Sequence, residues 1–134
     1  IKNILKKIHR TIKKIELDVH EKDIRWKRTA TEILQDAYVY KGKACTDLTI
    51  VFIAVARYFK FNPLFVKVYT QDKKIIHSLV EININDTLYY LDVLNANYEL
   101  VGKNLIFGKY LISKKGRDSW NIGLKNYNDL IHFT

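Results

Sequence analysis

The sequence has one cysteine, one proline, five glycines and no methionine among its 134 residues. A lone cysteine cannot form an intrachain disulfide, so no disulfide framework is present and we expect a cytoplasmic location. A segment preceding Ile1 could nevertheless hold a targeting signal. The longest apolar run, residues 48–56, contains a threonine and is far shorter than the roughly 20 residues of a transmembrane helix. No residues show the spacing of metal ligands, so we expect no metal or other cofactor.

What the sequence does contain is typical of a globular protein. Hydrophobic residues make up 48% of the chain, and 134 residues are enough to bury a real core. No repeat, low-complexity segment or linker interrupts the sequence. We therefore expect residues 1–134 to form a single domain.

Positive charge is concentrated near the N-terminus. The net charge is +9, and residues 1–28 hold ten Lys or Arg against four Asp or Glu. Such a segment could bind nucleic acid, an anionic membrane surface or an acidic partner. The alternative is a solvated helix face, which is favoured because no aromatic or glycine pattern of a nucleic-acid-binding module accompanies the charge.

The periodicity of apolar residues changes halfway along the chain. In the first half apolar residues recur every three or four positions, and the segment after Cys45 is apolar on nearly all sides, as in a central buried helix. The next segments are rich in β-branched and aromatic residues and are separated by turn residues. Residues 95–134 are expected to hold loops with one more strand or short helix. We predict an α+β protein with helices at 1–17, 24–38 and 45–59, packed on antiparallel strands at 64–70, 75–83 and 87–94.

Cys45 lies in the stretch "GKACTDLTIVFIAVARYF", residues 42–59, at the expected start of the third helix. A helix N-terminus offers unpaired N–H groups and partial positive charge, which favour a thiolate and can hold an oxyanion. Thr46 and Asp47 suit the first turn of such a helix. The other interpretation is a buried structural cysteine that behaves as a small hydrophobic residue.

Two polar residues interrupt otherwise apolar strands downstream, His77 in "IIHSLVEI" and Asp92 in "TLYYLDVL". Opposed residues of an antiparallel hairpin have position numbers of constant sum, and residues on one face keep its parity. A two-residue loop at 85–86 gives the sum 171, a four-residue loop gives 169, and His77 with Asp92 also gives 169. Either even loop places both side chains on one face, whereas an odd loop would separate them.

Cys45, His77 and Asp92 would together supply a nucleophile, a general base and a group that orients the base. Taken singly, a histidine at such a place is more often a structural hydrogen-bonding residue. Tyr40, upstream of the cysteine, is a candidate for stabilising an oxyanion.

The other histidines are expected to lie outside such a site. His9, on the basic helix, and His20 are predicted at the surface. His132, in the tail, has no predicted place.

These motifs resemble those of the transglutaminase-like superfamily of cysteine enzymes over about residues 30–94, with a weaker match in "GRDSWNIG", residues 116–123. The family pattern is a glycine and a cysteine followed by aspartate and an apolar helix, then His-Ala-Trp-x-Glu on a strand, then aspartate at the end of the next strand. The corresponding stretches here are "GKACTDLTIVFIAVARYFKF", "IIHSLVEI" and "YYLDVLN". The chain departs from the pattern in three ways: Gly42 lies three residues before the cysteine, Leu79 replaces the tryptophan, and no proline follows Asp92.

The resemblance implies a papain-like core at residues 30–94, in which Cys45 is the nucleophile, His77 the general base and acid, and Asp92 the residue that orients the imidazole. It implies acyl transfer from an amide bond of a protein or peptide substrate, by hydrolysis or by transamidation. The alternative is a non-catalytic binding module of the same fold that uses the basic N-terminal helix to hold a polyanionic partner or a membrane surface.

Overall fold

The computed structural model describes residues 1–24, 26–42, 44–94, 100–102, 108–125, 129 and 133. Within these residues the helices come first along the chain and most of the strands follow. The elements are α1 (Lys2–Thr11), β1 (Lys13–Ile15), α2 (Glu21–Ile24), α3 (Ala30–Asp36), β2 (Tyr38–Tyr40), α4 (Cys45–Tyr58), β3 (Leu64–Thr70), β4 (Ile76–Ile84), β5 (Thr87–Leu91), β6 (Leu100–Gly102) and β7 (Tyr110–Gly116).

The second half of the chain forms a five-stranded sheet in the order β6-β5-β4-β3-β7. Every neighbouring pair in this sheet is antiparallel, and the pairing of β3 with β7 shifts register between Lys67 and Val68. Strands β1 and β2 form a separate parallel ladder of two strands. Helices packed on an antiparallel sheet confirm the predicted α+β class.

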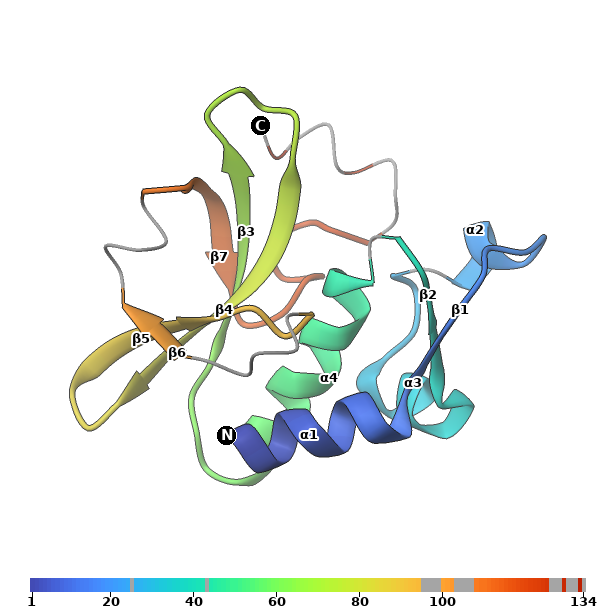
Figure 1. Ribbon diagram of the computed structural model, residues 1–134, viewed down its shortest axis with the longest axis horizontal. Coiled ribbons are helices and arrows are strands. Elements are labelled where there is room, and N and C mark those ends of the chain that lie inside the picture. The colour runs from blue at the N-terminus through green and yellow to red at the C-terminus, as the bar shows by residue number, and fades with distance from the viewer. Residues whose placement is uncertain are drawn as a thin grey trace.

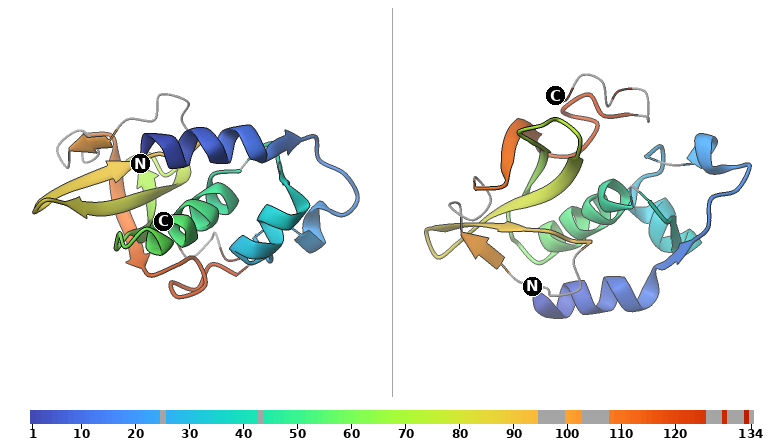
Figure 2. Two further views of the ribbon diagram at one scale, coloured as in Figure 1. Left: turned by 90° about the horizontal axis from the view of Figure 1, so that it is seen from below. Right: turned by 45° about the horizontal axis from the view of Figure 1, so that its top comes forward.

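Helix α4 lies at the centre of the molecule, between the sheet and α3 (Figure 1). It packs against β4 and β3, and both α1 and α3 contact it, so that α1 runs alongside it (Figure 2). Most of its residues are buried, as predicted for a helix that is apolar on nearly all sides. Its bounds agree with the predicted helix at 45–59 to within one residue.

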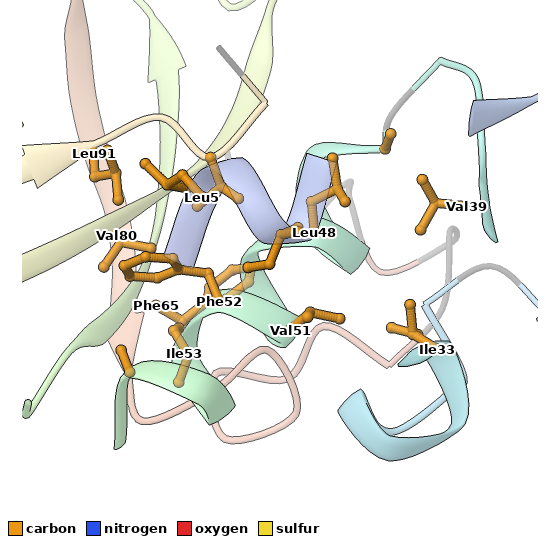
Figure 3. Close-up of a cluster of buried hydrophobic side chains, with 14 of the residues drawn as sticks. Leu5, Ile33, Val39, Leu48, Val51, Phe52, Ile53, Phe65, Val80 and Leu91 are labelled. Atoms are coloured by element: carbon orange, nitrogen blue, oxygen red, sulfur yellow. The ribbon is translucent and has the colours of Figure 1, made fainter. Parts of the chain in front are cut away.

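Two clusters of apolar side chains hold the layers together. The larger joins α1, α3, α4 and the sheet, and Figure 3 shows Leu5, Ile33, Phe52 and Val80 among its members. The smaller cluster lies on the alternate residues of the same strands, and comprises Val66, Val68, Leu79, Tyr90 and Tyr110. Because side chains alternate along a strand, the sheet is covered by apolar contacts on both faces.

The first helix ends earlier than predicted. Helix α1 stops at Thr11, and Ile12 is extended (φ −99°, ψ 119°), so β1 replaces the expected helical continuation to residue 17. The parallel partner of β1 is β2, which lies 25 residues further along the chain, with Lys13 opposite Tyr38. Within α1 itself the predicted amphipathic pattern is confirmed, because Leu5 and Ile8 are buried while the lysines are exposed.

The predicted helix at 24–38 is wrong as a single element. Helix α3 starts at a capping box, in which Thr29 Oγ1 accepts the Glu32 N–H (3.2 Å) and Glu32 Oε1 accepts the Thr29 N–H (3.1 Å). It ends at Asp36, and the residue that caps it, Ala37, takes a left-handed conformation (φ 60°), close to the predicted end at residue 38. The residues that follow form β2.

The strands agree better with the sequence. β3 has the predicted bounds, and β4 is displaced by one residue at each end. β5 ends at Leu91 rather than at residue 94, because Asp92 Oδ1 accepts the Leu94 N–H (3.0 Å) and turns the chain. In the tail, β6 and β7 are two strands where one strand or short helix was expected.

In the part of the chain that the structure describes, no helix is both long enough and apolar enough to cross a membrane.

Candidate active site

Cys45 is the first residue of α4 and is only 5% exposed. Gly42, whose positive φ of 67° is readily adopted by glycine, lies between β2 and the helix. In the first turn, Thr49 Oγ1 donates to the Cys45 carbonyl at 2.5 Å. Cys45 therefore lies at the positive, N-terminal end of the central helix.

The β4–β5 hairpin closes with a two-residue loop. Ile84 pairs with Thr87, and both loop residues, Asn85 and Asp86, have positive φ (51° and 66°), as a type I′ turn requires. This register puts position 77 and position 92 on one face as diagonal neighbours, which confirms the parity argument made from the sequence.

The hairpin brings His77 and Asp92 into direct contact. His77 Nε2 donates to Asp92 Oδ2 at 2.8 Å, and the histidine side chain is 12% exposed. The other carboxylate oxygen of Asp92 accepts the Leu94 N–H, which fixes the orientation of the carboxylate. The imidazole also stacks on Tyr110 of β7, with ring centres 6.1 Å apart. Its Nδ1 atom is the ring nitrogen that remains for another partner.

Cys45 and His77 change each other's pKa. Burial raises the pKa of the Cys45 thiol, but a hydrogen bond from His77 and the charges of Lys67 and His77 outweigh burial and lower it to about 7. Burial lowers the pKa of His77, but hydrogen bonds to Asp92 and Cys45 and their charges raise it to about 9. At a pH between about 7 and about 9, a thiolate on Cys45 beside an imidazolium on His77 is the favoured state.

A buried lysine that sequence reasoning missed lies next to this pair. Lys67 of β3 is 1% exposed, and its Nζ donates to Ser78 Oγ (2.7 Å) and to Thr46 Oγ1 (3.2 Å). The same ammonium lies 5.5 Å from the centre of the Trp26 ring. The available signal was the lysine in the middle of the apolar strand "LFVKVYT".

These side chains surround a cavity of about 330 Å³. Cys45, Lys67 and His77 contribute to its wall, so the three residues border one space. The complete lining among the described residues is Trp26, Cys45, Lys67, Lys74, Ile75, Ile76, His77 and Leu94.

The "GRDSWNIG" segment is hydrogen-bonded to one residue of the cavity wall. Gly116 leaves no room for a side chain, since a Cβ there would lie 2.3 Å from Asn121 Oδ1. Asn121 Oδ1 accepts the Arg117 N–H, which closes the turn. Trp120 Nε1 then donates to the carbonyl of Trp26 (3.3 Å), whose ring lines the cavity.

The described residues among the remaining candidates do not line this cavity. His9 was predicted at the surface but is half-buried, and its Nε2 donates to the Val93 carbonyl at 2.6 Å because α1 packs against the chain after β5. His20 is exposed, as predicted, and His132 lies outside the described residues. Tyr40 donates its hydroxyl to Asp18 Oδ1 (2.8 Å) and is not among the residues that line the described cavity.

Metal binding has no visible basis in the described ranges. Nowhere in them do three or more His, Cys, Asp or Glu side chains gather in a way that could hold a metal ion.

The fold is similar to that of a protein from Cytophaga hutchinsonii described as a candidate cysteine protease, with a TM-score of 0.63 and 15% sequence identity. The likeness covers 91% of this chain and 37% of the other, so the chain spans little more than a third of that structure. A family model described as a transglutaminase-like domain matches residues 1–121, and the chain therefore belongs to the transglutaminase-like family. The matched residues extend beyond both ends of the region 30–94, over which the sequence motifs resemble this family. No curated protein matches the chain.

Proposed function

We propose that the protein is a cysteine-dependent acyl-transfer enzyme in which Cys45 is the nucleophile, His77 the general base and acid, and Asp92 the orienting group. The observation that carries the proposal is the His77–Asp92 hydrogen bond of 2.8 Å, made by a histidine whose pKa is coupled to that of a cysteine at a helix N-terminus. A purely structural cysteine would not need a base that is itself oriented by a carboxylate. Membership of the transglutaminase-like family supports the same reading.

In the first half of the reaction the Cys45 thiolate attacks the carbonyl carbon of an amide or ester, and the carbonyl electron pair moves onto oxygen. Backbone N–H groups at the start of α4 stabilise this oxyanion. The imidazolium of His77 gives its Nδ1 proton to the leaving amine as the C–N bond breaks. The products are a thioester on Cys45 and a neutral imidazole that Asp92 still holds through Nε2.

In the second half an acyl acceptor attacks the thioester carbonyl. Neutral His77 takes the acceptor's proton, the C–S bond breaks, and the thiolate–imidazolium pair is restored. Water as acceptor gives hydrolysis, and an amine gives transamidation. The likeness to a structure described as a candidate cysteine protease supports hydrolysis of a peptide bond as the first possibility to test.

The alternative of a binding module that uses the basic N-terminal helix is less well supported. The apolar face of α1 packs into the core through Leu5 and Ile8, and His9 bonds to the Val93 carbonyl, so this helix has a structural task. The exposed lysines of α1 fit a solvated face. Binding of a polyanion or a membrane surface stays a prediction. That residues 1–134 form a single domain also stays a prediction.

The proposal is tested with p-nitrophenyl acetate, a small activated ester that needs no specific pocket. We expect a burst of p-nitrophenol and an acetyl group on Cys45, detected by peptide mass spectrometry. Cys45→Ala and enzyme blocked with iodoacetamide should show neither. Adding glycinamide then distinguishes the acceptors, since acetylglycinamide formed beyond the amount seen with Cys45→Ala shows that an amine resolves the thioester. Release of p-nitrophenol at the wild-type rate by Cys45→Ala would contradict the proposal.

A further inference from the structure

Three buried polar side chains, Thr46, Ser78 and Lys67, are hydrogen-bonded to one another between α4 and the sheet. Thr46 and Ser78 are 0% exposed and Lys67 is 1% exposed. The two hydroxyl oxygens lie 2.9 Å apart, and Lys67 Nζ donates to Ser78 Oγ at 2.7 Å and to Thr46 Oγ1 at 3.2 Å. Each side chain thus bonds to the other two. We call these three side chains the buried network.

The buried network occupies a layer that is otherwise packed with apolar side chains. Lys67 of β3 lies directly opposite Ser78 of β4, and by alternation both share the helix-facing side with Phe65 and Val80 of the larger core cluster. Apolar contacts there would join the helix to the sheet at no polar desolvation cost. Hydrogen bonds are directional, so a buried network specifies one arrangement of the two elements more strictly than apolar packing does.

Two members of the buried network are chain neighbours of the reacting residues. Thr46 directly follows Cys45, and Ser78 directly follows His77. The peptide plane keeps consecutive Cα atoms at about 3.8 Å, so fixing position 46 against position 78 restricts how Cys45 can move relative to His77. Ser78 also reaches Cys45 through its backbone: burial raises the pKa of the Cys45 thiol, and a backbone hydrogen bond from Ser78 is one of the contacts that lower it.

Lys67 acts on Cys45 in a second way, through its charge. Burial raises the pKa of the thiol, and after the hydrogen bond from His77 the charge of Lys67 is the next contact that lowers it. A test of positioning must separate the two effects. Among the described residues, the other charged or titratable groups near the buried network are Asp47 of α4, His77 of β4, Lys114 of β7, Asp92 after β5 and Lys74 before β4.

We propose that the buried network holds the Cys45 thiol within hydrogen-bond reach of the His77 imidazole, so that its three members are positioning residues for the reaction. This inference rests on the proposed function, because it assigns what keeps the nucleophile and its base together. A thiolate and an imidazolium stabilise each other less as they move apart. Displacing reacting groups by about 1 Å can slow an enzyme by about 10²-fold, so a rigid contact beside the pair has a direct use.

The experiment removes one hydroxyl at a time and keeps the ammonium of Lys67. In Thr46→Val and in Ser78→Ala, alkylation by iodoacetamide gives the pH midpoint of Cys45, and NMR of the ring gives that of His77. We expect the Cys45 midpoint to rise from about 7 towards the ordinary thiol value of about 8.5. We expect the His77 midpoint to fall from about 9 towards about 6.5. Each shift should amount to about one pH unit.

The opposite directions of the two shifts distinguish positioning from the charge of Lys67. If a variant only moved the ammonium away, a positive charge would be lost near both groups, and the pKa of each would rise. Separating Cys45 from His77 instead raises the pKa of the thiol and lowers that of the imidazole, because each loses the partner that stabilises its charged form. The proposal requires a fall of the His77 midpoint in every hydroxyl-deletion variant that folds, and an unchanged or raised midpoint would overturn it.

Matched variants control for the loss of a buried hydroxyl. Ser119→Ala, at a serine that is 1% exposed and does not line this cavity, should keep both midpoints. Thr46→Ser retains the hydroxyl and should also keep them. Circular dichroism checks that each variant is folded, and urea unfolding measures its stability. A loss of stability in Thr46→Val and Ser78→Ala with neither midpoint moved would show a packing role alone and overturn the proposal, as would equal shifts in Ser119→Ala.

This proposal and the acyl-transfer mechanism fail in different ways. If p-nitrophenyl acetate does not acylate Cys45 but the two midpoints shift in opposite directions, acyl transfer is wrong while the positioning of the pair stands. If acylation occurs and the midpoints stay at their wild-type values, the acyl-transfer mechanism stands and the role of the buried network is wrong.

Discussion

His77 Nε2 and Asp92 Oδ2 lie 2.8 Å apart across a hairpin whose two-residue loop fixes the register. The contact leaves Nδ1 as the only ring nitrogen for Cys45, so one side chain links a carboxylate to a thiol. The turn, the strand pairing and the helix that begins at Cys45 all contribute to this single arrangement.

Replacing Asp92 by asparagine keeps a hydrogen-bond acceptor but removes the charge. We expect the pKa of His77 to fall from about 9, because a hydrogen bond and a charge that raise it are weakened or lost. The acylation rate should fall by about 10²- to 10⁴-fold. An NMR titration of the His77 ring and the p-nitrophenyl acetate assay measure the two effects. Asp86→Asn, in the exposed turn, is the matched control, and an equal loss in both variants would contradict the role of Asp92.

Replacing His77 tests its role as the general base, and replacing an exposed histidine controls for the loss of any imidazole. His77→Gln is expected to slow acylation by at least about 10²-fold and to raise the pKa of the Cys45 thiol, since a hydrogen bond and a positive charge are lost. His20→Gln, at an exposed position, should behave as the wild type. Rates of acetyl transfer to Cys45, followed by mass spectrometry, check this prediction, which an active His77→Gln enzyme would refute.

The capping box of α3 is expected to stabilise the N-terminal half without affecting the chemistry. Thr29→Ala removes the acceptor of the Glu32 N–H and should lower the free energy of unfolding by about 1 kcal/mol. Thr31→Ala, an exposed threonine within the same helix, should change it by a few tenths at most. Urea unfolding measures both. Equal stabilities of the two variants would show that the cap contributes nothing.

Glu81 stands at the glutamate position of the family pattern, and its contacts indicate a structural task. Its Oε2 accepts the Tyr90 hydroxyl at 2.6 Å and Lys115 Nζ at 3.2 Å. Burial and the hydrogen bond to Glu81 raise the pKa of Tyr90, so the phenol stays a donor. Tyr90→Phe should cost about 1–3 kcal/mol of stability in urea unfolding, because a buried carboxylate loses a donor. Tyr89→Phe, on the other face, is the control, and comparable losses would argue against a specific bond.

Features that depend on contacts between residues close together in the sequence could be predicted, and features that depend on contacts between distant segments could not. The hairpin that joins His77 to Asp92 is local, so parity and a short loop were enough to predict that they share a face. The β1–β2 ladder could not be predicted in this way, since two three-residue strands far apart in sequence are stabilised by tertiary packing. Helical periodicity placed the end of the first helix at residue 17, because the distant pairing of β1 with β2 that ends the helix earlier leaves no local signal.

The missed parts of the site have the same physical cause. Lys67 sits in a strand where lysine is usually solvated, and only the three-dimensional positions of Thr46 and Ser78 reveal what holds its charge. His9 looked like a surface residue of a basic helix, and its bond to the Val93 carbonyl exists only once α1 has packed. The position of Cys45 at the start of a helix could be predicted from the sequence, because caps and apolar runs are local signals.

The pH dependence of Cys45 alkylation by iodoacetamide tests the central claim most directly. As the pH rises, the thiol should become reactive with a midpoint at about 7, and a second change should follow at about 9 as His77 loses its proton. In His77→Gln the second change should vanish and the first should move to higher pH. A single titration at or above about pH 8.5, the ordinary value for a free cysteine, unaltered in His77→Gln, would contradict an activated thiolate at this site.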